Sequence, residues 1–371
     1  MIKLMITILQ VIIILLLLTV IFVLYYNKHL KKFFKSLKRI DKEGKLYYIE
    51  YTGNYYSPFI TIPNKLIKPI KNAGCSCFYV KNPNKKNETA RNYDLAHIDK
   101  KGNPTGLNVV VKCNPKNKYS SIGIADAAFI SALGIPYYSG SLDNPKTNTS
   151  YLALLPYLCM DGINEKGLTV SILALDIKPG EQAVYQNTKG KKRVVIPTLL
   201  RLLLDNCSTT EEAINLAKSY NIVNTMGADF HLFVTDAYGN SIVLEWRYNE
   251  IKITYTDIVT NFIVSCEDAE DCYKNGKLKE KYIPPKENNK KYKFGYGHGY
   301  ERFKKIMKLI EKTEQDEMNI QKIRDSLKAV SQEYTGELTS LTQYSAIYHN
   351  NELSVDIWIY PDYSKKYHFD I

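Results

Sequence analysis

The chain has 371 residues, which is enough for one large domain or two of average size. Its 50 basic and 38 acidic side chains give a net charge of +12, which would suit nucleic acid or anionic lipid as a partner. Because no helix-turn-helix, zinc-finger or RNA-binding signature appears, we expect no nucleic-acid partner. The irregular cysteine and histidine spacings predict no disulfide framework, no metal and no cofactor.

The first predicted element is a transmembrane helix. Residues 4–26 carry no charge and are rich in Ile, Leu and Val, and a helix of that length spans the hydrocarbon core of a bilayer. No small-residue cleavage site follows, so we interpret the segment as an uncleaved anchor rather than a signal peptide. Basic residues between Lys28 and Arg39 follow it, so the positive-inside rule predicts a single-pass membrane protein with its catalytic part in the cytoplasm. An exported enzyme is the alternative.

A basic stretch and short strands follow the anchor. Apolar residues recur at helical spacing from Leu30 to Ile40, which favours an amphipathic helix on an anionic membrane or a solvated stalk. Strand-like pieces at 46–51 and 59–62 are interspersed with prolines. We therefore expect lipid contact through residues 4–40. The predicted division is an anchor (1–27), a basic juxtamembrane stalk and pro-segment (28–74) and one catalytic domain (75–371).

From residue 75 onward, strand patterns dominate. Alternation of apolar and polar residues predicts strands at 168–175, 230–234, 241–246, 251–255 and 262–265, and a C-terminal hairpin of 344–348 and 353–360. Helical patterns occupy 197–205, 209–219, 300–312 and 316–331. Strands, then helices, then strands predict an α+β fold with packed layers.

Cys75 is the strongest candidate for a catalytic residue. Arg91 follows it by 91 − 75 = 16 residues and Asp94 by 94 − 75 = 19 residues, and a hairpin would bring both back beside it. A nearby cation favours the thiolate, and a nucleophilic thiol needs a base to take its proton. Gly74 suits a backbone that is approached closely or cut. The alternative is an inert buried thiol, which is the usual state of a cysteine.

These segments resemble the choloylglycine hydrolase family, also called linear amide C–N hydrolases, which includes bile salt hydrolases and penicillin V acylases. The resemblance runs from residue 75 to the C-terminus, with Ala90 where the family has Gly. It implies an N-terminal nucleophile hydrolase with the four-layer αββα sandwich. The segments that carry it are Cys75-Ser76-Cys77-Phe78, Ala90-Arg91-Asn92-Tyr93-Asp94, residues 161–168, 197–201 and 258–262, and Glu301-Arg302-Phe303.

The resemblance also implies a role for each matching residue. Cleavage of the Gly74–Cys75 bond would make Cys75 the first residue, and its free α-amine would accept the thiol proton. Arg91 would stabilise the thiolate and Asp94 would orient the α-ammonium. Asn261 would donate to the oxyanion, and Arg302 would hold the charge balance of the site. The thiolate would attack an amide carbonyl, and water would hydrolyse the resulting thioester.

One position departs from the family pattern. Bile salt hydrolases have Asn, and penicillin V acylases tend to have Tyr, ten residues after the Asn of Asn-Glu-x-Gly-Leu. Here 164 + 10 = 174 is Ala174, so only its backbone N–H could assist the oxyanion, which weakens any expectation of bile salt specificity. Candidate substrate-pocket residues are the tyrosines of the preceding region: Tyr119, Tyr137, Tyr138, Tyr151 and Tyr157.

The leading functional prediction is therefore a membrane-anchored cysteine amidase that hydrolyses a small N-acyl amide, with a homo-oligomer as a possible assembly. An acyltransferase that passes the acyl group to an amine is the second candidate, because pocket shape rather than motif selects the acceptor. A catalytically inactive, membrane-tethered binding protein is the third.

Overall fold

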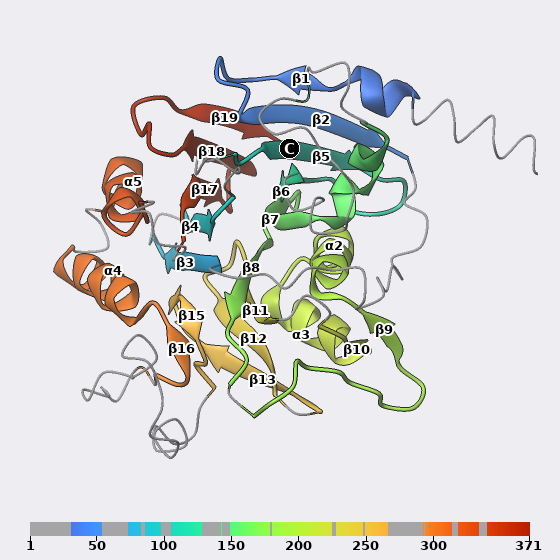
Figure 1. The fold of residues 1–371 in the computed structure, drawn as a ribbon, viewed down its shortest axis with the longest axis vertical. Coiled ribbons are helices and arrows are strands. Elements are labelled where there is room, and N and C mark those ends of the chain that lie inside the picture. Colours follow the sequence, from blue (N-terminus) through green and yellow to red (C-terminus); the bar gives the residue numbers. More distant parts are fainter. Residues whose placement is uncertain are drawn as a thin grey trace, which may run out of the picture.

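Two β-sheets that face each other form the centre of the molecule (Figure 1). The computed structural model describes residues 31–53, 73–82, 86–97, 105–127, 142, 149–178, 180–224, 228–247, 249–265, 292, 294–313, 318–333 and 340–371. Within these residues the larger sheet has nine strands and the smaller has six.

The strands of the larger sheet are, in spatial order, β1 (Lys38–Arg39), β2 (Leu46–Thr52), β5 (Asn108–Asn114), β6 (Ser121–Asp126), β7 (Cys159–Asn164), β8 (Thr169–Leu175), β11 (Asp229–Thr235), β12 (Ser241–Arg247) and β13 (Glu250–Tyr255). Those of the smaller sheet are β14 (Ile258–Val259), β3 (Ala73–Val80), β4 (Glu88–Leu95), β17 (Thr342–His349), β18 (Ser354–Ile359) and β19 (Tyr367–Asp370). Two short pairs are separate: β9 (Lys192–Val194) with β10 (Tyr220–Ile222), and β15 (Asn261–Phe262) with β16 (Gly297–His298).

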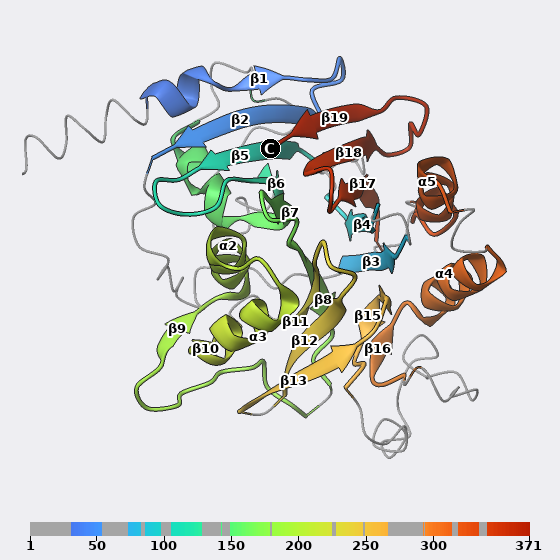
Figure 2. The same cartoon turned by 180° about the vertical axis from the view of Figure 1, so that it is seen from behind.

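Helices cover the outer faces of both sheets. On the larger sheet, α2 (Ile196–Asn206) packs against β7 and β8, and α3 (Thr210–Lys218) lies beside α2. On the smaller sheet, α5 (Ile320–Ala329) packs against β4 and β17, and α4 (Tyr300–Lys312) against β3 and β14. Opposite views show the two helix pairs on opposite sides of the sheets (Figure 1, Figure 2). This arrangement confirms the predicted α+β sandwich, with the layers in the order helix, sheet, sheet, helix.

Side-chain caps mark the N-termini of two of these helices, α3 and α5. The side chain of Thr209 caps α3 by accepting a hydrogen bond from the Glu212 backbone N–H at 3.2 Å. The Glu212 carboxylate in turn accepts from the backbone N–H of Ser208, the residue before Thr209. Asn319 caps α5 in the same way, accepting from the Lys322 N–H at 3.0 Å.

Sequence periodicity places most elements correctly. All four predicted helices are present, and the predicted strands correspond to β2, β8, β11, β12, β13, β17 and β18. The predicted strand at 262–265 is an exception, because β15 ends at Phe262 and residues 263–265 do not continue it. The predicted strand at 59–62 lies outside the described residues.

The N-terminal region corrects the membrane prediction. Among the described residues, no helix is long and apolar enough to cross a membrane, which contradicts the predicted localisation as a single-pass membrane protein. Residues 4–26, on which that prediction rested, lie outside the described residues. The apolar side of the predicted stalk packs on the protein rather than on lipid: Phe33 is 2% exposed with its ring 5.5 Å from that of Tyr51, and Phe34, Leu37 and Ile40 also contact the core.

The predicted pro-segment contributes to the larger sheet. β2 runs parallel to β5 over its full length, from the pair Leu46–Asn108 to the pair Thr52–Asn114. Leu46, Tyr47 and Ile49 are fully buried. Asp41 fixes the start of the strand, since its carboxylate accepts from the backbone N–H groups of Lys45 and Leu46. These residues therefore form part of the hydrophobic core.

Candidate active site

Cys75 lies on β3, which is flanked by β14 and β4 near one edge of the smaller sheet (Figure 1). The antiparallel partner β4 places Tyr93 opposite Cys75 and Arg91 opposite Cys77, so the predicted hairpin is present. Side chains two residues apart on a strand share a face, so both thiols point toward the Arg91 side. The Arg91 guanidinium contacts both: Nη2 lies 3.7 Å from Cys75 Sγ, and Nη1 lies 3.7 Å from Cys77 Sγ.

Arg91 is fully buried, and its charge is compensated from the other sheet. Its Nε forms an ion pair with Asp161 of β7, which is also fully buried. The Asp161 carboxylate in turn accepts hydrogen bonds from the hydroxyls of Tyr344, at 2.6 Å, and Tyr348 on β17. A buried carboxylate needs such donors to stay charged. The network therefore fixes the guanidinium against the two sulfurs.

Burial keeps both cysteines as thiols in the uncut chain. Burial raises the pKa of Cys75, and the opposing effect of Arg91 does not overcome it. Burial likewise raises the pKa of Cys77 to about 12. Cys75 is 3% exposed and Cys77 is fully buried, so Cys75 is the more accessible thiol.

Asp94 lies opposite Gly74, across the bond that precedes Cys75. Its carboxylate is fully buried and accepts from Thr342 Oγ1 and from Gln332 Nε2, each at 2.7 Å. Arg302 Nη1 lies 3.8 Å from Asp94 Oδ2. Burial raises the pKa of Asp94, and Arg302 and the hydrogen bonds act in the opposite direction.

Asn261 and Arg302 hold the backbone of Cys75. The Cys75 N–H donates to Asn261 Oδ1 at 2.7 Å, and Arg302 Nη2 donates to the same oxygen at 2.9 Å. Arg302 Nη1 donates to the Cys75 carbonyl and to Ser76 Oγ. The Asn261 amide group donates to the carbonyl of Ala174 on β8 at 2.8 Å, so Ala174 presents its carbonyl oxygen to this side chain.

Two glycines leave room for these contacts. A Cβ on Gly74 would lie 2.6 Å from Gln332 Nε2 and 3.4 Å from Arg302 Nη2. Gly299, the residue before α4, has φ of 86°, which L-residues rarely adopt, and a Cβ there would lie 2.6 Å from Arg302 Nη2. Gly299 therefore lets α4 begin where Arg302 can reach Cys75.

A second buried pair supports the chain next to Asn261. His231 of β11 donates from Nε2 to the Thr260 carbonyl at 2.8 Å, and its Nδ1 lies 3.0 Å from Glu245 Oε1 on β12. Glu245 also accepts from the backbone N–H groups of Val264 and Ser265. The two side chains therefore hold both ends of the 260–265 segment.

The structure brings Cys75, Arg91, Asp94, Asn261 and Arg302 into one cluster. Two of the tyrosines predicted to line the substrate pocket, Tyr119 and Tyr157, lie in another part of the molecule. Tyr119 donates its backbone N–H to the Asp205 carbonyl at 3.0 Å. Burial raises the pKa of Tyr157, and the charge of Asp205 adds to this effect. Both therefore lie near the end of α2. Tyr137, Tyr138 and the side chain of Tyr151 are outside the described part of the chain.

Sequence reasoning missed four residues of this cluster. Asp161 was visible only as the first residue of a matching turn, and nothing in the sequence indicates that it pairs with Arg91. Ser76 was visible only as part of the matching segment around Cys75, and Gln332 and Thr342 gave no signal, because Gln and Thr are common in strands and loops. Their contacts with Arg302 and Asp94 depend on tertiary packing alone.

Comparisons with known proteins identify the family. The family model of acyl-coenzyme A:6-aminopenicillanic acid acyl-transferase matches residues 149–359, more than half of the chain. The chain belongs to this family. The match includes Asp161, Asn261 and Arg302, whereas Cys75 and Arg91 precede it.

Solved structures with the same fold support the assignment. A variant of conjugated bile acid hydrolase from Clostridium perfringens superposes with a TM-score of 0.53 and 16% identity, over 80% of this chain and 92% of that one. Penicillin V acylase from Agrobacterium tumefaciens gives a TM-score of 0.52 and 16% identity, over 80% and 86%. No curated protein sequence matches the chain. The resemblance to the choloylglycine hydrolases is thus confirmed. The family model relates the chain to an acyl-transferase, and the solved structures show that it shares the N-terminal nucleophile fold with a bile acid hydrolase and a penicillin V acylase.

Proposed function

We propose that the chain hydrolyses a linear N-acyl amide through a thioester on Cys75, after its own cleavage exposes Cys75 as an N-terminal residue. The observation that carries this proposal is the pair of contacts made by Cys75. Its sulfur faces the Arg91 guanidinium, and its nitrogen is held by Asn261. A cation at the sulfur favours the thiolate. A fixed nitrogen would become a fixed amine, positioned to take the thiol proton once the peptide bond is cut.

Maturation would begin with attack of Cys75 Sγ on the Gly74 carbonyl carbon. The C–N bond to Cys75 breaks, and the proton of the thiol passes to the departing nitrogen. Water then hydrolyses the thioester, which leaves a carboxylate on Gly74 and a free amine on Cys75. Arg302 and Asn261 fix the backbone on the far side of the bond, and the absence of a side chain at Gly74 lets Gln332 and Arg302 pack closely around the residue that would be cut off.

The catalytic cycle would use the same groups. The α-amine of Cys75 takes the thiol proton, the thiolate attacks the amide carbonyl of the substrate, and the amine product leaves with that proton. Asn261 would supply the N–H that is not donated to Ala174 as a donor for the oxyanion. Asp94 lies where Gly74 departs and would then pair with the α-ammonium. Water hydrolyses the thioester and regenerates Cys75.

Intact mass and N-terminal sequencing of the purified full chain test the maturation step. We expect a fragment that begins at Cys75, and Cys75→Ala should give an uncut chain without activity. Cys77→Ser serves as the matched control and should still be cut. Full activity in an uncut wild-type chain would contradict the N-terminal nucleophile mechanism.

Acyl transfer to an amine is the second candidate, because the matching family model is that of an acyl-transferase. Conjugated bile salts, penicillin V and simple N-acyl amides serve as probes, each incubated with and without an added amine such as 6-aminopenicillanic acid. Hydrolysis alone yields the free acid at a rate independent of the amine. Transfer yields an amide product that rises with amine concentration at the expense of the acid. Hydroxylamine should trap the acyl group in both cases, because both pass through the thioester.

A further inference from the structure

Five ionisable side chains form a row across the smaller sheet, away from Cys75. The register pairs Glu88 of β4 with His349 of β17, and Asp356 of β18 with His368 of β19. His349 also pairs with Ser354, which pairs with Asp370 and lies two residues before Asp356. Paired residues and residues two apart share a face, so all five lie on one face of the sheet.

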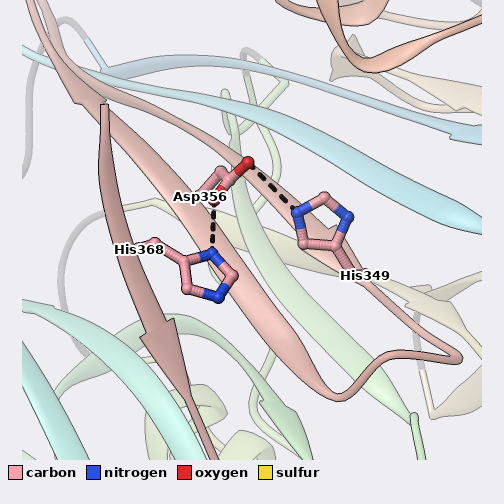
Figure 3. Close-up of side chains that lie close together, drawn as sticks. All are labelled: His349, Asp356 and His368. Atoms are coloured by element: carbon pink, nitrogen blue, oxygen red, sulfur yellow. Dashed lines mark hydrogen bonds and ion pairs between the residues drawn. The ribbon is translucent and has the colours of Figure 1, made fainter. Parts of the chain in front are cut away.

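The two imidazoles converge on one carboxylate. Figure 3 shows His349 and His368 each turning a ring nitrogen toward Asp356. His349 Nε2 lies 3.3 Å from Asp356 Oδ2, and His368 Nδ1 lies 2.6 Å from Asp356 Oδ1. One ligand atom from each residue lies within 4.8 Å of the other two. Ligands around a tetrahedral zinc ion lie about 3.3 Å apart, because zinc–ligand bonds are about 2.0–2.2 Å long. The side chains therefore need only small adjustments to surround a metal.

A second carboxylate contacts the outer nitrogen of each ring. His349 Nδ1 lies 2.6 Å from Glu88 Oε2, and His368 Nε2 lies 3.2 Å from Asp370 Oδ1. A histidine that binds a metal through one nitrogen usually presents the other to a carboxylate or carbonyl, which fixes the ring and its tautomer. Both histidines here have that arrangement, one buried and one at the surface.

We propose that His349, Asp356 and His368 bind a divalent transition metal of the zinc class, with Glu88 and Asp370 orienting the two imidazoles. Two imidazoles and one carboxylate are a ligand set suited to such ions. Without a metal, Lys366 occupies this place, with its Nζ 3.0 Å from Asp356 Oδ2. Its side chain is half exposed and can turn into solvent.

The role that this position supports is structural. Glu88 and Arg91 are three residues apart on β4 and thus lie on opposite faces, so the metal would lie on the other side of the sheet from the Cys75 thiol. Along β4, Glu88 is six residues from Asp94, or about 20 Å. The ligands come from three successive strands, so a bound metal would fasten the C-terminal strand β19 to the sheet.

Zinc titration of the chelator-treated full chain by calorimetry tests the proposal. We expect one stoichiometric site and a higher melting temperature with zinc. His368→Ala and Asp356→Asn should each weaken binding by at least about tenfold. His368 is 44% exposed, so its variant should fold, and the melting temperature without metal checks this. Cobalt(II) should give d–d bands without thiolate charge transfer, which distinguishes this site from the cysteines.

A pair of neighbouring lysines provides the matched control. Lys366→Ala removes the competing cation from Asp356 and should bind zinc more tightly than Lys365→Ala, whose side chain lies 4.9 Å from the Tyr367 ring. If the row were only a network of ion pairs, Lys366→Ala would lower stability and leave zinc binding unchanged. That result, the absence of a stoichiometric site, or equal zinc affinity in the wild-type chain and His368→Ala would overturn the proposal.

Discussion

At the scale of single residues, Arg91 is the most constrained group in the candidate site. It contacts two sulfurs with its terminal nitrogens and one carboxylate with Nε, and all of these groups are buried. Asp161 supplies the compensating charge. A buried ion pair contributes little net stability, but removal of one partner leaves an uncompensated charge in the core.

Asp161→Asn should therefore destabilise the protein strongly. We expect a loss of about 3–5 kcal/mol in the free energy of unfolding, the usual range when one partner of a buried pair is removed. Tyr348→Phe removes one hydrogen bond to Asp161 and keeps the charge, so it should cost about 1–3 kcal/mol. Denaturant titration measures both values. Equal losses in the two variants would argue against charge compensation as the role of Asp161.

Cys77 shares Arg91 with Cys75 but has a different predicted role. Its thiol is fully buried, and burial raises its pKa to about 12. Cys77→Ser should therefore retain most of the turnover, whereas Cys75→Ser should lose it. Peptide mapping after brief iodoacetamide treatment should find Cys75 alkylated first. An inactive but folded Cys77→Ser variant would reverse the assignment of the nucleophile.

At the scale of elements, the short strands β14 and β15 place Asn261. β14 pairs with β3 in the smaller sheet, whereas β15 pairs with β16, and Thr260 lies between them. Such short strands have few hydrogen bonds of their own. The His231–Glu245 pair reaches Thr260 and Val264 from the larger sheet, so it acts on Asn261 through the backbone.

The loss of stability in His231→Gln should depend on pH, because the substitution removes a hydrogen bond to the Glu245 carboxylate. Burial acts to raise the pKa of Glu245, but the hydrogen bonds from His231 and the backbone lower it overall. A carboxyl whose folded pKa is depressed stabilises the protein above its unfolded pKa, about 4.3, and loses that effect as the pH falls through the folded value. We expect His231→Gln to cost about 1–3 kcal/mol at pH 7 and less at pH 4. Unfolding midpoints at both pH values measure this, and a pH-independent difference would contradict it.

The activity of His231→Gln should separate positioning from folding. We expect kcat to fall more than KM changes, because displaced Asn261 affects the oxyanion more than substrate binding. A surface variant such as Lys365→Ala serves as the control for kinetics. Unchanged kcat in a destabilised His231→Gln variant would restrict the pair to a structural role.

At the scale of the whole molecule, the larger sheet joins residues from both sides of the proposed cleavage point. β2 precedes Gly74, and its partner β5 follows Cys75. The stacked rings of Tyr48 and Phe369, with centroids 5.8 Å apart, add a contact between β2 and the C-terminal strand. We therefore propose that the catalytic domain includes residues before 75, in place of a domain beginning at the nucleophile.

Two truncations should behave differently. A chain that begins at residue 31 keeps Phe33 and β2 and should fold. A chain that begins at residue 54 loses three fully buried side chains, Leu46, Tyr47 and Ile49. Burial of each such side chain contributes about 2–5 kcal/mol, so their combined loss exceeds the stability of a typical domain. Circular dichroism and thermal melting distinguish the two, and a cooperative melt of the shorter chain would contradict the integral role of β2.

How far the sequence predicts the structure depends on the range of the interactions. Local patterns located α2 and β8 within a few residues, because periodicity and capping act within one element. Local patterns could not show which part of the protein, or which partner, covers the apolar face of an element. The apolar residues between Leu30 and Ile40 suited a membrane surface or a solvated stalk, and the structure packs those that it describes, from Phe33 onward, on the core.

The same limit applies to the site. The 16-residue spacing of Cys75 and Arg91 predicted a hairpin, which the register confirms. Asp161 and His231 come from distant parts of the chain and meet the cluster only because the two sheets stack. Side chains that act across layers leave no periodic pattern for sequence reasoning to detect.

The position of β2 has a consequence for the energetics of the mature enzyme. If the bond before Cys75 is cut, β2 and β5 belong to separate polypeptides that share one hydrophobic core. Unfolding then releases two molecules instead of one, so the melting temperature should rise with protein concentration, as it does for an obligate dimer. The uncut Cys75→Ala chain should melt at a temperature independent of concentration. The cut enzyme, once unfolded, would regain activity by a second-order reaction whose rate falls on dilution.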